Sequence, residues 1–497
     1  MNPAVRRPSP VRRVSFYFLV ALLVVTLYLL VAFLQNGAFG FPLDDAWIHQ
    51  VYARNLGARF EFSFFAGQPS AGSTSPLWTL LLSVGYVLRI DYFAWAILLG
   101  IIFLGASGWM TQRVTSHLTD DARAAHWFAP LFLLLEWHMV WAAASGMEIM
   151  LFVFLTLALI EAFLAKRHAL LLGLLAGLLV LTRPDGIVLV GLVGAGLLWR
   201  ALRAPKGFQN SLGLETLAAF AITFLIVLLP YLYFNLQISE TLLPNTFYAK
   251  SAEYAELTQT NFFARWLSLY RQPLLGAQLL LAPGFIYAFY FFARKRTWEK
   301  LLPALWLVAL PALYAWRLPV EYQFGRYMMP LIPFMIIYGI VGVKFIFEKI
   351  SARVIRRAWT LTLAALLFAF LFLGATLYAQ AVAIITCEMV AVAQFTRANL
   401  PPGARIAAHD IGAQGYFDPD RPMLDLAGLV SPEVIPFIRD EAKLKTWMLE
   451  RGAQYAIFFP TWYPRLARDA QFHEIFSTGC AATREMGEEN LRVYEVR

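Results

Sequence analysis

Long apolar segments with almost no charged residues constrain this chain more than any other feature. Residues 15–34, 150–164 and 361–377 are three of them. A membrane span of about 20 apolar residues is the usual way to remove such a segment from water. The composition agrees, because 59% of the 497 residues are hydrophobic and 15% are charged, whereas soluble domains carry about 25% charged residues. A membrane protein is therefore predicted, which excludes a cytosolic enzyme, a secreted disulfide scaffold and a disordered protein.

Twelve apolar segments are candidate helices in or at the membrane. One of them, 76–90, is short and begins with Pro76 after Ser75, which is typical of a helix start. Residues 75 and 146 are both expected outside, so an even number of crossings must separate them. We therefore predict that 76–90 is an interfacial helix and that about 11 transmembrane helices remain. The predicted spans are 15–34, 93–112, 125–144, 147–164, 168–182, 186–199, 215–236, 274–292, 301–316, 327–346 and 358–385.

Basic residues near the ends of the spans predict the orientation, because Lys and Arg stay preferentially on the cytoplasmic side. Eighteen of them lie at the N-terminus and in four connections, whereas the connections around 35–75, 145–148, 183–185, 237–273 and 317–326 together hold eight. The N-terminus is thus predicted to be cytoplasmic, and the loops 35–75 and 237–273 extracytoplasmic. The net charge of +9 then needs no nucleic acid partner. The eighteen residues are Arg6, Arg7, Arg12, Arg13, Lys166, Arg167, Arg200, Arg203, Lys206, Arg294, Lys295, Arg296, Lys300, Lys344, Lys349, Arg353, Arg356 and Arg357.

The composition changes after residue 385, which divides the chain into a membrane domain, 1–385, and a soluble domain, 386–497. Strand-like runs separated by turns or helical stretches predict a small α/β domain outside the cytoplasm. The runs are Arg405–His409, Pro422–Leu426, Gln454–Phe459 and Leu491–Val496. Cys387 and Cys480 both fall in this outer domain, where either a disulfide or two unpaired thiols is compatible with the compartment.

Two adjacent carboxylates follow the first span in the segment Phe41–His49. Asp44 and Asp45 repel each other, which raises the pKa of one and makes it a candidate base. They could instead share a divalent cation, for which Mg²⁺, Mn²⁺ and Ca²⁺ are the options. The alternative is an ordinary helix N-terminus or a solvated acidic loop, because Asp is common at both.

Other polar residues collect in the predicted outer turns, where they could activate a nucleophile or hold a phosphate group. Within spans, Glu136 and His138 are expected to form a hydrogen-bonded pair, and Gly173 and Gly177 a helix-packing face. The sequence has no Gly-rich phosphate loop, dinucleotide fingerprint or zinc spacing. The outer polar residues are His49, Arg54, Glu148, Arg183, Asn245, Lys250, Arg326, Tyr327, His409 and Asp410.

These outer segments, taken in order, resemble the bacterial polytopic glycosyltransferases of the GT-C superfamily. The resemblance is strongest to cell-wall arabinofuranosyltransferases and their relatives. It implies transfer of a monosaccharide from a polyprenyl-phosphate donor to a glycan, lipid or protein acceptor on the outer side of the cell membrane. The segments that carry it are Leu43–Ile48, Tyr52–Leu56, Gly72–Trp78, Ser145–Glu148, Thr182–Gly186, Leu243–Lys250, Gly325–Pro330, His409–Ala413 and Asp425–Val430.

Carried over to this chain, the resemblance makes Asp44 the base that deprotonates the acceptor and Asp45 the residue that orients it, binds the sugar or holds a divalent cation. His409 and Asp410 are expected on the acceptor side. The lipid tail is expected in a groove beside the helix at 76–90. The residues expected to bind the donor phosphate or sugar are His49, Arg54, Glu148, Arg183, Asn245, Lys250, Arg326 and Tyr327.

Two other classes of function remain open from the sequence. A transporter or flippase of lipid-linked sugars would need polar residues through the membrane midplane and often has inverted repeats. A non-catalytic envelope scaffold would tolerate changes at Asp44 and Asp45.

Overall fold

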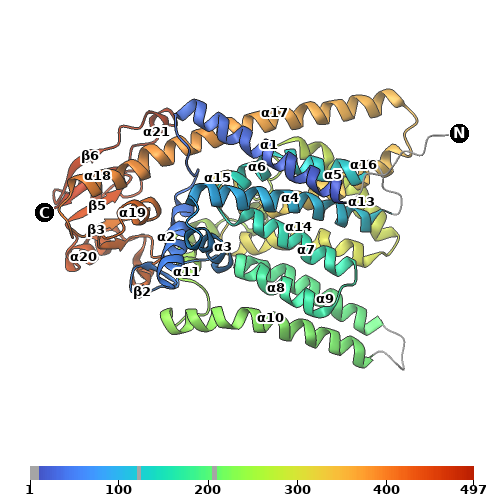
Figure 1. Ribbon diagram of the computed structural model, residues 1–497, viewed down its shortest axis with the longest axis horizontal. Coiled ribbons are helices and arrows are strands. Elements are labelled where there is room, and N and C mark those ends of the chain that lie inside the picture. The colour runs from blue at the N-terminus through green and yellow to red at the C-terminus, as the bar shows by residue number, and fades with distance from the viewer. Residues whose placement is uncertain (1–9, 120–124, 204–209) are drawn as a thin grey trace.

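The computed structural model describes residues 10–119, 125–203 and 210–497. Long helices lie side by side along the longest axis, with the C-terminal sheet at one end of the molecule (Figure 1). Arg6, Arg7 and Lys206, used above to predict the orientation, lie outside the described residues. The helices of the bundle are α1 (Pro10–Asn36), α4 (Tyr92–Leu118), α5 (Ala125–Leu135), α6 (Trp137–Ala144), α7 (Ile149–Leu164), α8 (Ala169–Thr182), α9 (Ile187–Arg203), α10 (Asn210–Ser239), α13 (Ala282–Arg294), α14 (Trp298–Arg317), α16 (Ile332–Phe347) and α17 (Arg353–Ile385).

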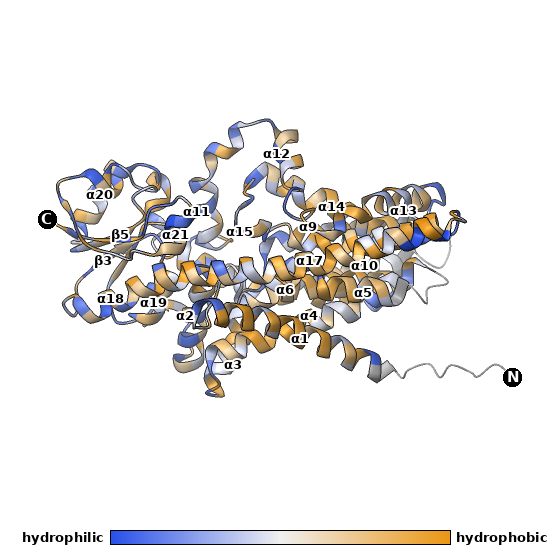
Figure 2. Cartoon of the chain, turned by 90° about the horizontal axis from the view of Figure 1, so that it is seen from above, coloured by the Kyte–Doolittle hydropathy of each residue, from blue (hydrophilic) through white to orange (hydrophobic). Residues whose placement is uncertain are grey.

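Seven helices in the described part of the chain are long and apolar enough to cross a membrane, or eight if the bent pair α5 and α6 is one span. Each of the 11 predicted spans is helical, but α7 and α8 have only 16 and 14 residues, short of the roughly 20 that a crossing needs. The count of 11 is therefore not confirmed. Apolar residues line these helices along their length (Figure 2).

The bend between α5 and α6 has a local cause. Glu136 ends α5 and caps α6, because its carboxylate accepts the Met139 backbone N–H at 3.1 Å. The same carboxylate bonds His138 Nδ1 at 2.7 Å. The two helix axes differ by 56°. Glu136 and His138 are hydrogen-bonded as predicted, but as neighbours at the start of α6 and not as a contact between two packed helices. The bend lies at Glu136, whose backbone is extended.

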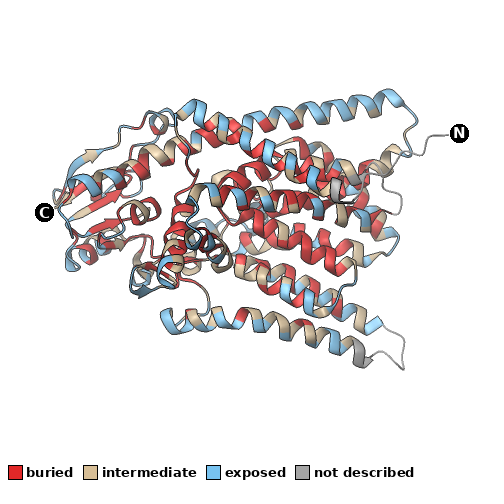
Figure 3. Cartoon of the chain, in the orientation of Figure 1, coloured by how far each residue is buried: buried red, intermediate tan, exposed pale blue. Residues whose placement is uncertain are grey.

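Small residues let the helices approach closely. A Cβ at Gly173 would lie 2.5 Å from the Phe220 carbonyl oxygen, and one at Gly177 would lie 2.6 Å from Val227 Cβ. The predicted packing face on α8 therefore meets α10. Buried residues concentrate in the middle of the bundle, especially α6 and α7, while much of α10 and α17 is exposed (Figure 3).

Short elements connect the helices of the bundle. The predicted interfacial helix corresponds to α3 (Pro76–Val87), beside α2 (Asp44–Arg59). The other elements are β1 (Ser63–Phe65), β2 (Gln68–Pro69), η1 (Pro184–Gly186), α11 (Asn245–Glu253), η2 (Ala255–Gln259), α12 (Phe262–Ser268), η3 (Ala277–Leu281), α15 (Tyr322–Gly325) and η4 (Met329–Leu331).

The C-terminal part is a five-stranded mixed sheet in the order β4-β3-β5-β7-β6. The four predicted strands are present, and β6 was not predicted. Strand β3 is parallel to β4 and β5, whereas β7 is antiparallel to β5 and β6. The elements are α18 (Ala391–Asn399), β3 (Ile406–Ala408), α19 (Gly412–Phe417), β4 (Met423–Asp425), η6 (Pro432–Phe437), α20 (Glu441–Glu450), β5 (Tyr455–Phe458), η7 (Leu466–Arg468), β6 (Phe472–Ser477), α21 (Ala481–Glu485) and β7 (Arg492–Val496).

Alternate residues of the sheet face opposite sides, as the strand period requires. Ile406 and Ile457 pack with Val51 of α2, whereas Ala456 and Phe458 pack with Leu444 and other residues of α20. The sheet is thereby fixed against one end of the bundle.

The bundle and the sheet are also joined covalently. Helix α17 continues through a π turn, η5 (Thr386–Val390), into α18, so the predicted boundary at 386 falls inside a continuous helix. Cys387 in this turn is disulfide-bonded to Cys480. Glu388, next to it, accepts the Leu491 N–H at 3.0 Å and bonds Asn490 Nδ2 at 2.7 Å.

Candidate active site

The first turn of α2 carries the two predicted acids, where carboxylates are favoured by the positive end of the helix dipole. The Asp44 carboxylate points at the start of α19. Its Oδ2 accepts the Gly412 N–H at 2.7 Å and its Oδ1 accepts the Ala413 N–H at 2.8 Å. Asp44 therefore joins the bundle to the sheet domain. Each oxygen keeps a lone pair for a further hydrogen bond.

The two acids have opposite electrostatic surroundings. Burial raises the pKa of Asp44 to about 6, with Asp45 adding to the rise and the two backbone N–H groups limiting it. Burial acts in the same direction on Asp45, but the positive charges of Lys250 and Arg326 outweigh it and lower the pKa of Asp45. At neutral pH Asp44 is thus a carboxylate close to its titration point, which suits a general base, and Asp45 is a fixed negative charge.

Asp45 is paired with two cations from distant parts of the chain. Arg326 Nη2 bonds Asp45 Oδ2 directly, and Lys250 Nζ lies 3.5 Å from the same oxygen. Both cations also donate to the Tyr327 hydroxyl, each at 3.2 Å. Burial lowers and Asp45 raises the pKa of Lys250, and the net shift is upward, which keeps the ammonium charged.

A strained turn positions Arg326. Gln323 and Phe324 have φ values of 55° and 57°, and Gly325 has 64°. A non-glycine residue in this left-handed region costs about 1–2 kcal/mol, and such strain clusters at functional sites. The Arg326 side chain is 4% exposed. Its Nε and Nη1 are buried without a partner in the described structure, so this guanidinium can still donate to an anion.

Two cavities of about 590 Å³ each meet at these residues. The apolar cavity lies among α8, α9, α10, α11 and α14, with Val180, Ile187, Leu228, Leu232 and Leu313 in its wall. The polar cavity lies between α2, α11 and the sheet domain, and Asp44 is in its wall. Both are lined by Asp45, Ile48, Lys250, Arg326 and Leu429.

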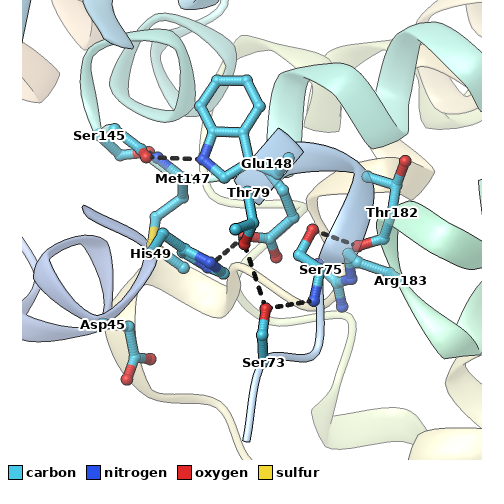
Figure 4. A network of polar contacts seen from close by, with 12 residues as sticks. Asp45, His49, Ser73, Ser75, Thr79, Ser145, Met147, Glu148, Thr182 and Arg183 are labelled. Carbon is cyan, nitrogen blue, oxygen red and sulfur yellow. Dashed lines mark hydrogen bonds and ion pairs between the residues drawn. The ribbon is translucent and has the colours of Figure 1, made fainter. Parts of the chain in front are cut away.

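A polar network borders the apolar cavity (Figure 4). His49 Nε2 lies 3.3 Å from Glu148 Oε2. The Ser75 hydroxyl donates to the Thr182 carbonyl at 2.6 Å, which fixes the chain before α3 to the end of α8. Arg183 pairs with Asp185 at 3.0 Å and donates to the Tyr314 hydroxyl at 2.8 Å. This Arg is therefore partly neutralised by its own neighbours.

Most of the predicted site residues come together. His49, Glu148, Arg183 and Tyr327 line the apolar cavity, and His409 and Asp410 the polar one. The lipid groove was predicted beside α3. Residues 72–74, just before α3, line the apolar cavity, but no residue of α3 does.

Two predicted site residues line neither of these cavities. Arg54 donates to the carbonyls of Tyr416 and Gly415 at 2.8 and 3.1 Å, and thereby supports α19. Asn245 begins α11, where its backbone N–H donates to the Ala71 carbonyl at 2.9 Å.

Sequence reasoning missed several residues of the two cavity walls. These are Glu253, Tyr254, Tyr314, Arg317, Tyr322, Arg439, Trp462 and Tyr463. Their sequence carried no usable motif, although Glu253 and Tyr254 continue the helix that Lys250 occupies. A test of that helix periodicity could have found these two.

Known structures share the fold of this chain over nearly its whole length. The crystal structure of ArnT from Cupriavidus metallidurans bound to undecaprenyl phosphate is similar, with a TM-score of 0.62 and 16% identity over 98% of each chain. The Archaeoglobus fulgidus oligosaccharyltransferase in complex with Zn and sulfate is similar, with a TM-score of 0.59 and 12% identity over 92% of this chain and 71% of that one. Both have the membrane fold of the GT-C superfamily.

The chain has the GT-C fold. The arabinofuranosyltransferase AftD from Mycobacteria matches 96% of this chain and 40% of its own at a TM-score of 0.48 and 15% identity. A family model described as "Domain of unknown function (DUF8728)" matches residues 375–494, which include the sheet of this GT-C fold. No curated protein sequence matches the chain.

The donor set of the candidate site does not fit a resident divalent cation. Asp44 accepts two backbone N–H groups, and Asp45 is paired with Arg326 and Lys250. Hard cations such as Mg²⁺ and Ca²⁺ need several oxygen ligands. No group of three or more His, Cys, Asp or Glu residues in the described ranges could hold a metal ion. Lys250 and Arg326 therefore supply the positive charge beside Asp45, where the sequence allowed a divalent cation.

Proposed function

We propose that the chain is a membrane glycosyltransferase that moves a monosaccharide from a polyprenyl-phosphate donor to an acceptor hydroxyl outside the cytoplasm. The observation that carries this proposal is the junction of an apolar and a polar cavity at Asp45, Lys250 and Arg326. A lipid-linked sugar phosphate has the same order of parts: a long apolar tail, an anionic phosphate and a polar sugar.

The donor fits this order. The isoprenoid tail lies in the apolar cavity against Leu228, Leu232 and Leu313, where it is removed from water. The phosphate binds the two unpartnered nitrogens of Arg326, while Asp45 holds the third nitrogen of that guanidinium. Lys250 supplies a second positive charge. The ArnT structure, which holds undecaprenyl phosphate, supports this class of lipid.

The chemistry is a single displacement. The acceptor oxygen attacks the anomeric carbon and a new C–O bond forms, while the bond from that carbon to the phosphate oxygen breaks. Its electron pair leaves with the polyprenyl phosphate, whose growing negative charge Arg326 and Lys250 stabilise. Asp44, in the wall of the polar cavity, takes the acceptor proton. A single displacement inverts the anomeric configuration.

In the predicted orientation, the site lies on the same side of the membrane as a lipid-linked donor in the outer leaflet. With the N-terminus cytoplasmic, the C-terminal sheet and both cavities lie on the extracytoplasmic side. The acceptor is then a glycan, lipid or protein of the cell envelope.

Undecaprenyl phosphate binding tests the proposal. We expect the purified chain to bind this lipid, and Arg326→Gln to weaken binding and reduce transfer by about 10²–10³-fold, as for loss of one donor to a transition-state anion. Arg200→Gln is the control, because Arg200, which is partly buried, is likewise paired with an acid, Glu299, and lines neither cavity. Native mass spectrometry measures the binding. Equal binding by the Arg326 and Arg200 variants would refute the phosphate site.

A further inference from the structure

The strand order of the C-terminal sheet points to a ligand site of its own. Strand β3 lies between β4 and β5, and all three are parallel. From β3 the chain moves to β4 on one side, and from β4 it crosses to β5 on the other. Ligands of open parallel sheets bind outside the carboxyl ends of the strands at such a reversal. The crevice expected here lies beyond the ends of β3 and β5.

The residues that follow these two strands line the polar cavity. His409 and Asp410 come directly after β3, and Trp462 and Tyr463 come after β5. His409 Nδ1 bonds the Tyr463 hydroxyl at 2.7 Å, which ties the two loops together. Asp410 Oδ2 is buried in the described structure without a hydrogen-bond partner. The crevice of the sheet therefore opens into the cavity that contains Asp44.

We infer that the carboxyl ends of β3 and β5 form the acceptor subsite, and that this subsite binds a sugar that carries no negative charge. The inference rests on the proposed transferase function and names the acceptor class for it. Trp462 is 44% exposed in the cavity wall and meets the His409 ring edge-on at 4.8 Å. An aromatic face beside hydroxyl and carboxyl groups matches a sugar ring, which is apolar on its faces and polar at its edge.

The opposite wall of the cavity supports the same class of ligand. Glu253 lies 3.7 Å from His409 Nε2, and Arg439 Nε donates to the Glu253 carbonyl at 2.7 Å. Once Lys250, Arg326 and their partner Asp45 are assigned to the donor phosphate, three acids of the wall besides Asp410 remain beside one Arg, namely Asp44, Glu253 and Glu441 beside Arg439. An anionic acceptor would meet like charges here, which disfavours it.

The protonation state of Asp410 also suits a sugar. Burial raises the pKa of Asp410 well above its usual range, and the charges of Asp44, Asp45 and Glu253 raise it further. A neutral carboxyl group both donates and accepts a hydrogen bond, as does each hydroxyl of a sugar. Asp410 can then hold one acceptor hydroxyl while Asp44 removes the proton from another.

Direct sugar binding tests this inference without requiring turnover. The purified full-length chain in lipid nanodiscs is mixed with maltotriose, which is neutral, or trigalacturonate, which is anionic, and binding is measured by saturation-transfer NMR. We expect maltotriose to bind and trigalacturonate to bind at least tenfold more weakly. Trp462→Ala should abolish the maltotriose signal, and Trp462→Phe should retain part of it. Trp298→Ala is the control, since Trp298 is 49% exposed at the far end of α14.

The same samples separate this inference from the proposed function. Undecaprenyl phosphate binding should be equal in the wild type and the Trp462 variants, because Trp462 lines only the polar cavity of the two. Absence of maltotriose binding, its survival in Trp462→Ala, or a preference for trigalacturonate would each overturn the sugar subsite. If the wild type binds maltotriose in a Trp462-dependent way but does not bind undecaprenyl phosphate, the proposed donor is refuted and the sugar subsite is not.

Discussion

At the scale of single residues, the two adjacent acids have different tasks because different partners hold them. Asp45 is fixed by Arg326 and Lys250, and its lowered pKa makes it a poor proton acceptor. Asp44 is held by uncharged N–H groups, and its raised pKa leaves it able to accept a proton near neutral pH. In the proposed mechanism, Asp44 is therefore the residue that serves the acceptor, and Asp45 is the one that positions the cations.

Replacing the proposed base tests this division. Asp44→Asn should reduce kcat by about 10²–10⁴-fold, which is the usual contribution of a general base. Binding of undecaprenyl phosphate should be unchanged. Asp418→Asn provides the control, since Asp418 is also a buried acid, bonded to Arg421 outside the two cavities. Transfer of labelled sugar and lipid binding measure the two effects. Near-normal turnover by Asp44→Asn would rule Asp44 out as the base.

The pH profile tests the protonation state of the same carboxylate. Asp44 acts only when deprotonated, and its pKa is raised to about 6. We therefore expect kcat/KM to be level above pH 7 and to fall toward tenfold per unit below pH 6. Initial rates measured between about pH 4.5 and 8 give this pH profile. A rate that stays level down to pH 5 would contradict the assignment.

At the scale of elements, α19 is the contact through which the sheet domain holds Asp44, the proposed base. Gly412 begins this helix, and a Cβ there would lie 2.2 Å from the Asp44 carbonyl oxygen and 2.7 Å from Asp44 Oδ2. The absence of a side chain at Gly412 is what allows the two backbone N–H groups to reach the carboxylate.

Adding one methyl group at this position should separate the elements. Gly412→Ala is expected to displace α19 from Asp44 and to lower transfer by about tenfold or more, as misplacement of a catalytic group by 1 Å can cost about 10²-fold. Gly191→Ala is the control, because no atom lies within 4 Å of a Cβ built there. Transfer rates of the two variants at equal protein give the comparison. Full activity of Gly412→Ala would show that α19 does not position the base.

The disulfide between η5 and the start of α21 is a second link between the bundle and the sheet. It closes a loop of 93 residues, so its loss should lower the free energy of unfolding of the sheet domain by roughly 2–5 kcal/mol. The Cys387→Ser and Cys480→Ser double variant tests this by thermal unfolding against the oxidised protein. Unchanged unfolding of the double variant would show that Glu388 and the packing on α2 suffice.

At the scale of the whole molecule, the sequence predicted the parts better than their assembly. Long apolar segments located the bundle helices, and strand-like runs between turns located four of the five strands of the C-terminal sheet. Asp44 and Asp45 stood out because acids are rare beside membrane spans. Their partners could not be predicted from local patterns, since Arg326 is 281 residues from Asp45 and Gly412 is 368 residues from Asp44. The left-handed turn before Arg326 and the loops after β3 and β5 acquire their roles only in the assembled cavity.

Turnover of lipid-linked sugars tests the central claim most directly. The chain, reconstituted in vesicles with polyprenyl-phosphoryl sugars extracted from the producing cells and an envelope acceptor fraction, is followed by mass spectrometry of the lipids. We expect free polyprenyl phosphate to accumulate with the wild type and not with Asp44→Asn. Lipid-linked sugars that remain intact, or that only move from one leaflet to the other, would contradict a glycosyltransferase.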